Sequence, residues 1–130
     1  MPRYFTPEEA AALIPQLSSI LLEMQKDKSD LDAKEEELKE AQQRSKSNGH
    51  SQARELQAQR AALERLADKL NEGIARIGAL GCQLKDIALG LVDFPAVREG
   101  KAVLLCWRLG EAAVDHWHEV DTGYGSRQPW

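Results

Sequence analysis

Apolar residues recur every three or four positions through the first eighty residues, which is the spacing of one face of a helix. One stripe follows a seven-residue rhythm at Leu17, Leu21, Met24, Lys28, Leu31, Glu35 and Leu38. A second stripe contains Leu56, Gln59, Leu63, Leu66, Leu70, Ile74 and Ile77. Between them lies Ser45–Ser51, a turn-forming stretch with an Asn-Gly pair. The pattern predicts two long helices that fold back on each other as an antiparallel hairpin.

Folding the chain at this turn pairs positions whose numbers add up to about 97, so that the two stripes meet. Leu31 then lies near Leu66, and Leu17 lies near Leu80. Leu31 and Leu38 stand almost alone among charged residues, which predicts a narrow, coiled-coil-like seam. The beginning of the first helix carries more apolar surface than one seam needs. We therefore expect a further packing partner there.

The start of the helical region has clear end signals. Thr6 is a suitable N-cap, Pro7 fits the first helical position, and Glu9 completes a capping box. Pro15 should kink the helix, because its ring clashes with the carbonyl four residues earlier. We expect a short segment over about 7–14, a long one over about 16–46, and a second helix over about 52–80 that ends before Gly81.

After residue 81 the helical periodicity is lost. Residues 90–95 read as a short extended or turn segment, and 98–101 as a turn. Residues 102–109 and 112–119 read as two strands joined by a two-residue turn at Gly110 and Glu111. In that register, pairs add up to about 221, and His116 and His118 share a face with Leu105 and neighbouring apolar residues. The tail from Asp121 to Trp130 reads as irregular.

The predicted fold is thus α+β and mostly α. A long antiparallel helical hairpin occupies residues 1–80, and a small antiparallel β cap, residues 81–130, lies at its open end. A lone two-helix hairpin buries too little apolar surface to be stable. We therefore expect the proximal helix surface both to pack on the cap and to form a homodimer with a four-helix arrangement.

Composition narrows the class of partner. The chain has 17 basic and 21 acidic residues among 130 and a net charge of −4, which argues against a nucleic-acid or anionic-membrane binder. No apolar run resembles a signal peptide or a membrane helix. Cys82 and Cys106 are far apart and read as small buried side chains in a reducing compartment; the alternative is a disulfide or a metal site that uses both. We expect a cytoplasmic protein.

His116-x-His118 is the first candidate for chemistry. On a strand, both imidazoles lie on one face and reach one divalent transition metal, with Asp93, Glu111 or Asp121 as a third ligand. The predicted metal ligands are His116, His118 and Asp121. The alternative is that His118 is a buried histidine that bonds to a carboxylate. The cofactor is therefore either unknown or a divalent transition metal.

A second cluster surrounds the predicted turn at residues 110 and 111. Arg108 and Asp115 are diagonal neighbours in the predicted register, and a salt bridge that holds the turn is the simpler interpretation. Alternatively, Arg108 and Arg127 clamp a carboxylate or phosphate while His118 acts as acid or base. Many charges in a small cap require pairing or a ligand.

Several motifs resemble those of the prokaryotic domain-of-unknown-function family 2203. They are Tyr4-Phe5-Thr6 with Pro15, Gly90–Pro95, Leu105–Glu111, Trp117-His118, Gly123 and Arg127. The likeness covers nearly the whole chain outside the hairpin tip, and it brings no established activity. It implies that Asp93, Arg108, Glu111, His118 and Arg127 belong to the family pattern, from which His116 departs.

Two functional hypotheses follow. In the first, the chain is a non-catalytic interaction or scaffold protein that acts as a homodimer and presents its helices to a protein partner. In the second, it binds a small molecule or a metal, and whether it is an enzyme stays open. The second hypothesis uses a site in the cap at Asp93, Arg108, Glu111, His118 and Arg127.

Overall fold

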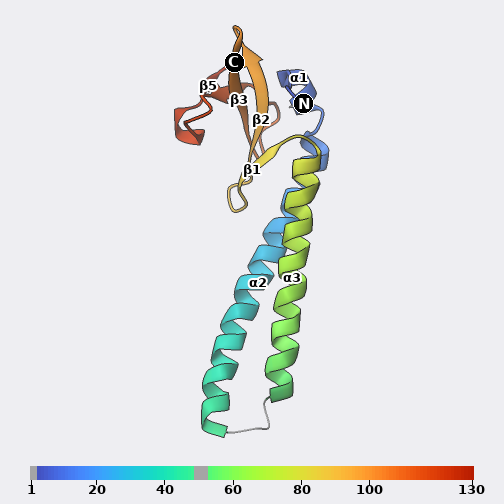
Figure 1. Cartoon of the computed structure of the whole chain (residues 1–130), viewed down its shortest axis with the longest axis vertical. Helices are drawn as coiled ribbons and strands as arrows, with labels where there is room; N and C mark the ends of the chain where they lie inside the picture. Colours follow the sequence, from blue (N-terminus) through green and yellow to red (C-terminus); the bar gives the residue numbers. More distant parts are fainter. Residues whose placement is uncertain (1–2, 49–52) are drawn as a thin grey trace. The chain divides into compact units, whose positions relative to one another are not determined.

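The computed structural model describes residues 3–48 and 53–130 (Figure 1). Helix α1 covers Pro7–Ala11, α2 covers Ile14–Asn48 and α3 covers Ala53–Ala79. The two long helices pack against each other, which confirms the predicted hairpin. The predicted turn residue Gly49 lies outside the described residues.

The helix boundaries agree closely with their local signals. The Thr6 hydroxyl accepts a hydrogen bond from the Glu9 backbone N–H at 3.1 Å, and the Glu9 carboxylate accepts one from the Thr6 backbone N–H at 2.9 Å. The predicted capping box is therefore formed. The helical run is interrupted at Ala12 and Leu13, and Pro15 is the second residue of α2. Its ring excludes a continuous helix from α1 into α2, as expected.

The chain divides into two compact units. The helical unit is Glu23–Glu72. The sheet unit combines Met1–Leu22 with Gly73–Trp130, so that it contains the proximal ends of both long helices as well as the strands. The division predicted at residues 80 and 81 stays a prediction, and in these units the proximal helix ends belong with the sheet.

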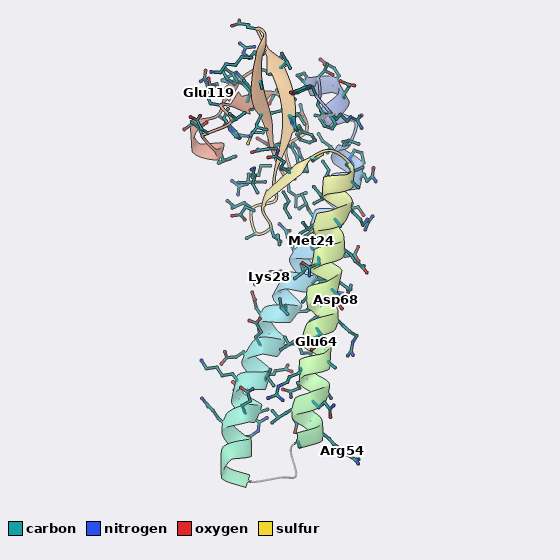
Figure 2. The ribbon with its side chains drawn as sticks, viewed as in Figure 1. Met24, Lys28, Arg54, Glu64, Asp68 and Glu119 are labelled. Atoms are coloured by element: carbon teal, nitrogen blue, oxygen red, sulfur yellow. The ribbon has the colours of Figure 1, made fainter. Side chains whose placement is uncertain are left out.

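In the helical unit, Asp27 forms an ion pair with Lys69 at 3.1 Å, which agrees with an antiparallel register of α2 and α3. Charged side chains such as Arg54, Glu64 and Asp68 project from α3 (Figure 2). Ile74, which the periodicity placed in the seam, lies in the sheet unit with 45% of its surface exposed. The neighbouring Gly73 is buried instead.

Five antiparallel strands form one sheet in the order β1-β2-β3-β4-β5. Their bounds are β1 Gln83–Asp86, β2 Leu91–Arg98, β3 Lys101–Arg108, β4 His116–His118 and β5 Gln128–Pro129. The predicted turn at 98–101 joins β2 and β3. Glu99 and Gly100 both have positive φ there, as a type I′ hairpin turn requires. The backbone twist of a type I′ turn matches the right-handed twist of the two strands that it joins, which favours the long β2–β3 ladder.

The register between β3 and β4 corrects the sequence prediction. Leu104 pairs with His118 and Cys106 pairs with His116, so that paired numbers add up to 222 rather than about 221. The turn consists of Arg108–Glu111, closed by a hydrogen bond from Glu111 N to Arg108 O at 3.0 Å, and an irregular segment follows it before β4. One residue of slip moves every side chain to the opposite face. The histidines therefore share a face with Leu104 and Cys106, not with Leu105.

The C-terminal tail is more ordered than predicted. A 3-10 helix, η2, covers Tyr124–Ser126, and β5 pairs with β4 through Trp117 and Gln128. The expectation of an irregular tail was therefore wrong. Hydrogen bonds from Trp130 N to Asp115 O at 2.7 Å and from Arg98 Nη1 to Trp130 O at 2.9 Å hold its end.

The core of the sheet unit lies on the face of β2 and β3 opposite the histidines. Phe94, Leu105 and Trp107 alternate on this face and are fully buried. The Phe5 ring meets Phe94 edge-on with centroids 5.4 Å apart, and Phe5 N donates to Pro95 O at 2.7 Å. The proximal helix residues Leu17, Ile20, Leu21 and Ile77 are buried in the same unit. This apolar packing leaves the other face of the sheet for polar residues.

Candidate functional site

Three neighbouring strands bring polar side chains to the face of the sheet opposite the core. Asp93 of β2 pairs directly with Cys106 of β3. His118 of β4 pairs with Leu104, which is two residues from Cys106 and therefore on the same face. Asp93, Cys106 and His118 are all at most 3% exposed. Each is held by a regular ladder, so the position of this group is set by backbone pairing.

Asp93 and His118 form a close buried pair. His118 Nε2 lies 3.1 Å from Asp93 Oδ2, and His118 Nδ1 lies 2.7 Å from the carbonyl oxygen of Glu119. Because a carbonyl only accepts hydrogen bonds, Nδ1 carries a proton. Burial raises the pKa of the Asp93 carboxyl, and the neighbouring His118 opposes this shift. The contact at Nε2 therefore needs either a shared proton or a cation between the two groups.

Cys106 completes the group and was missed as a functional residue by sequence reasoning. One ligand atom from each of Asp93, Cys106 and His118 lies within 4.8 Å of the other two. Burial, reinforced by the Asp93 charge, raises the pKa of the Cys106 thiol to about 11, although nearby Arg127 opposes the rise. The correct strand register was the signal that would have found Cys106, because it places the thiol beside the histidine face.

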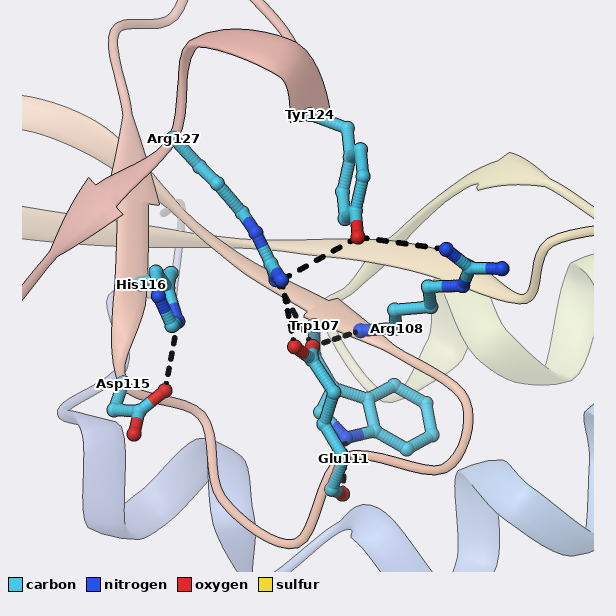
Figure 3. Close-up of polar contacts among 7 residues, drawn as sticks. All are labelled: Trp107, Arg108, Glu111, Asp115, His116, Tyr124 and Arg127. Atoms are coloured by element: carbon cyan, nitrogen blue, oxygen red, sulfur yellow. Dashed lines mark hydrogen bonds and ion pairs between the residues drawn. The ribbon is translucent and has the colours of Figure 1, made fainter.

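Arg127 and Glu111 lie next to this group and form a bidentate ion pair (Figure 3). Arg127 Nη1 donates to Glu111 Oε1 at 3.0 Å, and Nη2 donates to Oε2 at 2.7 Å. The backbone N–H of Arg108 donates to the same Oε1 at 2.7 Å. Burial raises the pKa of Glu111, but the hydrogen bonds from Arg127 and Arg108 outweigh it and hold that pKa below 4.5.

Tyr124 connects the two arginines. Its hydroxyl lies 3.4 Å from Arg127 Nη2 and 3.5 Å from Arg108 Nη1. The Arg127 guanidinium also lies over the Tyr124 ring, 4.4 Å from its centroid. Glu111 already holds Arg127, whereas the Arg108 guanidinium contacts the Tyr124 hydroxyl, so the Arg108–Arg127 clamp stays a prediction. Sequence reasoning had read Tyr124 only as part of an irregular tail.

The turn itself is locked by Glu111 and Trp107. Trp107 Nε1 donates to the Glu111 carbonyl at 2.9 Å, and Gly110 has a positive φ of 104° at the third turn position. The predicted Arg108–Asp115 salt bridge is not formed. Arg108 contacts Tyr124, and Asp115 pairs with His116 at 2.8 Å, because the altered register separates the two residues.

The predicted metal set of His116, His118 and Asp121 is not brought together. Among residues 3–48 and 53–130, the metal-ligand types that approach one another closely are Asp93, Cys106 and His118. His116 is half-buried beside Asp115, and Asp121 is exposed after β4. The five candidate ligand residues therefore separate into a buried pair, Asp93 and His118, and a neighbouring network of Arg108, Glu111 and Arg127. Cys106 lies between them.

A shallow hollow of about 260 Å³ lies near the β2–β3 turn and is lined by Arg98, Glu99, Lys101, Val103, Trp117 and Glu119. The Arg98 guanidinium lies about 5 Å from the centroids of both the Trp117 and Trp130 rings. None of the sequence-predicted ligand residues lines this hollow. His118 is therefore not placed at the wall of an open cavity there.

Searches of the curated proteins and of the solved structures found no match to the chain. No helix in the described part of the chain is long and apolar enough to cross a membrane. One family model, described as "Uncharacterized conserved protein (DUF2203)", matches residues 3–130 and so covers both the helical hairpin and the sheet with its polar face. The chain therefore belongs to this uncharacterized conserved family, DUF2203.

Proposed function

We propose that the chain is a non-catalytic interaction protein that forms a homodimer through its helical unit. The observation that carries this proposal is the low burial of an apolar seam. Among the described residues of Glu23–Glu72, those that are buried, with at most 7% exposed, are Met24, Asp27, Ala41 and Leu70. Five seam leucines keep intermediate exposure: Leu31, Leu38, Leu56, Leu63 and Leu66.

The length of the helices makes this exposure costly. At about 1.5 Å per residue, the part of α2 in the helical unit extends for roughly 35–40 Å. A single pair of helices over that length covers each seam from one side only. A second copy that packs on the same stripe would bury the remaining surface of the leucines in a four-helix arrangement. Each fully buried leucine contributes about 1.5–3 kcal/mol relative to an exposed one.

The charges on the helical unit favour a second copy of this chain as the occupant. Glu35, Glu36 and Glu37 are exposed on α2, and Arg44 and Arg54 are exposed near the other end of the hairpin. The helical unit therefore carries both signs of charge on its surface. A surface that carries both signs of charge can be self-complementary, as a symmetric dimer requires.

Catalysis is not part of this proposal. The candidate acid or base, His118, is 1% exposed, and both of its ring nitrogens already have partners within the chain. A substrate would have to displace these contacts to reach the ring. The helical unit, in contrast, leaves its apolar stripe only half-buried, so a partner can pack on it without any rearrangement.

Sedimentation equilibrium of the full chain tests the proposal. We expect a dimer mass, and Leu63→Glu should shift it to a monomer that keeps its helical circular dichroism. Gln57→Glu is the matched control, because it adds the same charge at an exposed position of α3. A wild-type monomer at all concentrations, or a dimer that survives Leu63→Glu, would contradict the proposal.

A further inference from the structure

The polar face of the sheet carries a second, independent inference. We propose that Asp93, Cys106 and His118 form a binding site for a divalent transition-metal ion, with Zn²⁺ as the best-fitting ion. The three residues supply one oxygen, one sulfur and one nitrogen donor from three adjacent strands. Mixed donors that include a thiolate and an imidazole favour Zn²⁺ over Mg²⁺ or Ca²⁺, which prefer oxygen alone.

The distances suit such a site. The three donor atoms lie within 4.8 Å of one another, and Asp93 Oδ2 is 3.1 Å from His118 Nε2. Bond lengths of about 2.0–2.3 Å place the ligand atoms of a tetrahedral Zn²⁺ roughly 3.3–3.8 Å apart. Small side-chain rotations are therefore enough to admit the ion, and the paired strands need not move.

The outer contacts orient the histidine as metal sites do. The Glu119 carbonyl accepts a hydrogen bond from Nδ1–H of His118 at 2.7 Å, so that in the neutral ring the lone pair of Nε2 faces Asp93 and Cys106. A hydrogen bond from the non-ligating nitrogen to a carbonyl is a common feature of metal-bound histidines, because it fixes both tautomer and ring orientation. The Nε2 lone pair then faces the Asp93 carboxylate, and the two repel each other unless a cation lies between them.

Charge balance points in the same direction. A carboxylate from Asp93 and a thiolate from Cys106 together carry two negative charges, which Zn²⁺ neutralises in a site shielded from water. The Cys106 thiol must lose its proton when the ion binds, so binding releases protons. Arg127 beside the thiol is held by Glu111, so its charge is already paired. Three protein ligands leave a fourth position for water or another small ligand.

Titration of metal-free full-length protein with Co²⁺ alone and with Zn²⁺ alone tests the site. Co²⁺ should bind at one ion per chain with a sulfur-to-cobalt charge-transfer band and visible bands of tetrahedral coordination, and Zn²⁺ should displace it. Cys106→Ser should abolish the charge-transfer band, and His118→Gln should abolish stoichiometric binding. Cys82→Ser and His116→Gln are matched controls that should bind as the wild type does, because Cys82 is the chain's other buried cysteine.

Folding of the variants is checked by the near-ultraviolet circular dichroism of the tryptophans, and Asp93→Asn provides a further conservative variant. Zn²⁺ should raise the Tm of the wild type and of both controls, but not that of Cys106→Ser. The proposal is overturned if millimolar Co²⁺ gives no charge-transfer band with the wild type. It is also overturned if that band persists in folded Cys106→Ser, or if His116→Gln loses binding as His118→Gln does. None of these results depends on the oligomeric state.

Discussion

Arg127 binds Glu111 through two parallel hydrogen bonds, 3.0 Å and 2.7 Å long. Arg127 lies in the C-terminal tail, and Glu111 lies 16 positions earlier in the turn after β3. The pair attaches the C-terminal segment to the turn that follows β3. Both side chains are less than a third exposed, so solvent screens the pair only partly.

We expect Arg127→Lys to lower the free energy of unfolding by about 1–3 kcal/mol, because a lysine cannot reproduce the bidentate geometry. Urea denaturation followed by tryptophan fluorescence measures the change. Asp32→Asn is the control, since it breaks the exposed Lys28–Asp32 pair and should cost only about 0.3–0.5 kcal/mol. Equal losses in the two variants would show that the Arg127–Glu111 pair is no more than a surface contact.

The same pair predicts a pH dependence of stability. The pKa of Glu111 is held below its ordinary value of 4.5 in the folded chain, so the carboxylate stabilises the fold above that pH. This contribution should disappear as the pH falls from 4.5 through the lower, folded pKa. We expect the stability difference between wild type and Glu111→Gln to be full at neutral pH and to shrink in acid. Denaturation curves at several pH values measure it, and a difference that grows in acid would refute the assignment.

The buried carboxylate of Asp27 in the helical unit predicts an asymmetric pair of effects. Its side chain is 5% exposed, and Lys69 is its partner at 3.1 Å. Lys69→Ala leaves the buried Asp27 charge unpaired and should lower the free energy of unfolding. Asp27→Leu removes the buried charge and should be close to neutral or stabilising. Thermal unfolding of both variants and of the double variant decides the matter, and a larger loss in Asp27→Leu would disprove this account.

Gly90 and Gly100 offer a matched test of backbone strain and packing. Both have positive φ, 69° and 78°, so a side chain is strained at either position. A Cβ at Gly90 would lie 2.5 Å from the Cβ of Leu109, whereas nothing lies within 4 Å of a Cβ at Gly100. Gly100→Ala should cost about 1–2 kcal/mol from backbone strain alone.

Gly90→Ala should cost clearly more than Gly100→Ala, because the Leu109 backbone must also move, and Leu109 N donates to Gly90 O at 2.9 Å. Chemical denaturation of the two alanine variants compares them directly. If both lose the same stability, the close approach of Leu109 to Gly90 is not part of the folded state in solution.

The helices were predictable because their signals are local. The capping box at Thr6 and Glu9, the break before Pro15 and the heptad stripes each depend on residues within one or two turns. The antiparallel pairing of the two helices was also predictable, because a fold-back near Gly49 brings their apolar stripes together. The Asp27–Lys69 contact agrees with that fold-back.

The sheet was predictable only in part. The positive-φ turn at Glu99 and Gly100 was identified from its sequence, but strand β1 and the pairing of Gln128 were not, since neither has an alternating apolar pattern. The exposed Ile74 shows the same limit in the helices. Periodicity assigns a residue to a stripe, but in the tertiary structure the buried position here is Gly73 and not Ile74.

By itself, the sequence determined the two helices, their antiparallel pairing and a polar cluster in the last forty residues that includes Asp93, Arg108, Glu111, His118 and Arg127. Only the tertiary structure decided how that cluster is divided. Because side chains alternate along a strand, a one-residue change in the β3–β4 register moved His118 to the face of Cys106 and Asp93 and left Arg108 apart from Asp115. The loop that sets this register is irregular, so no local pattern encodes it.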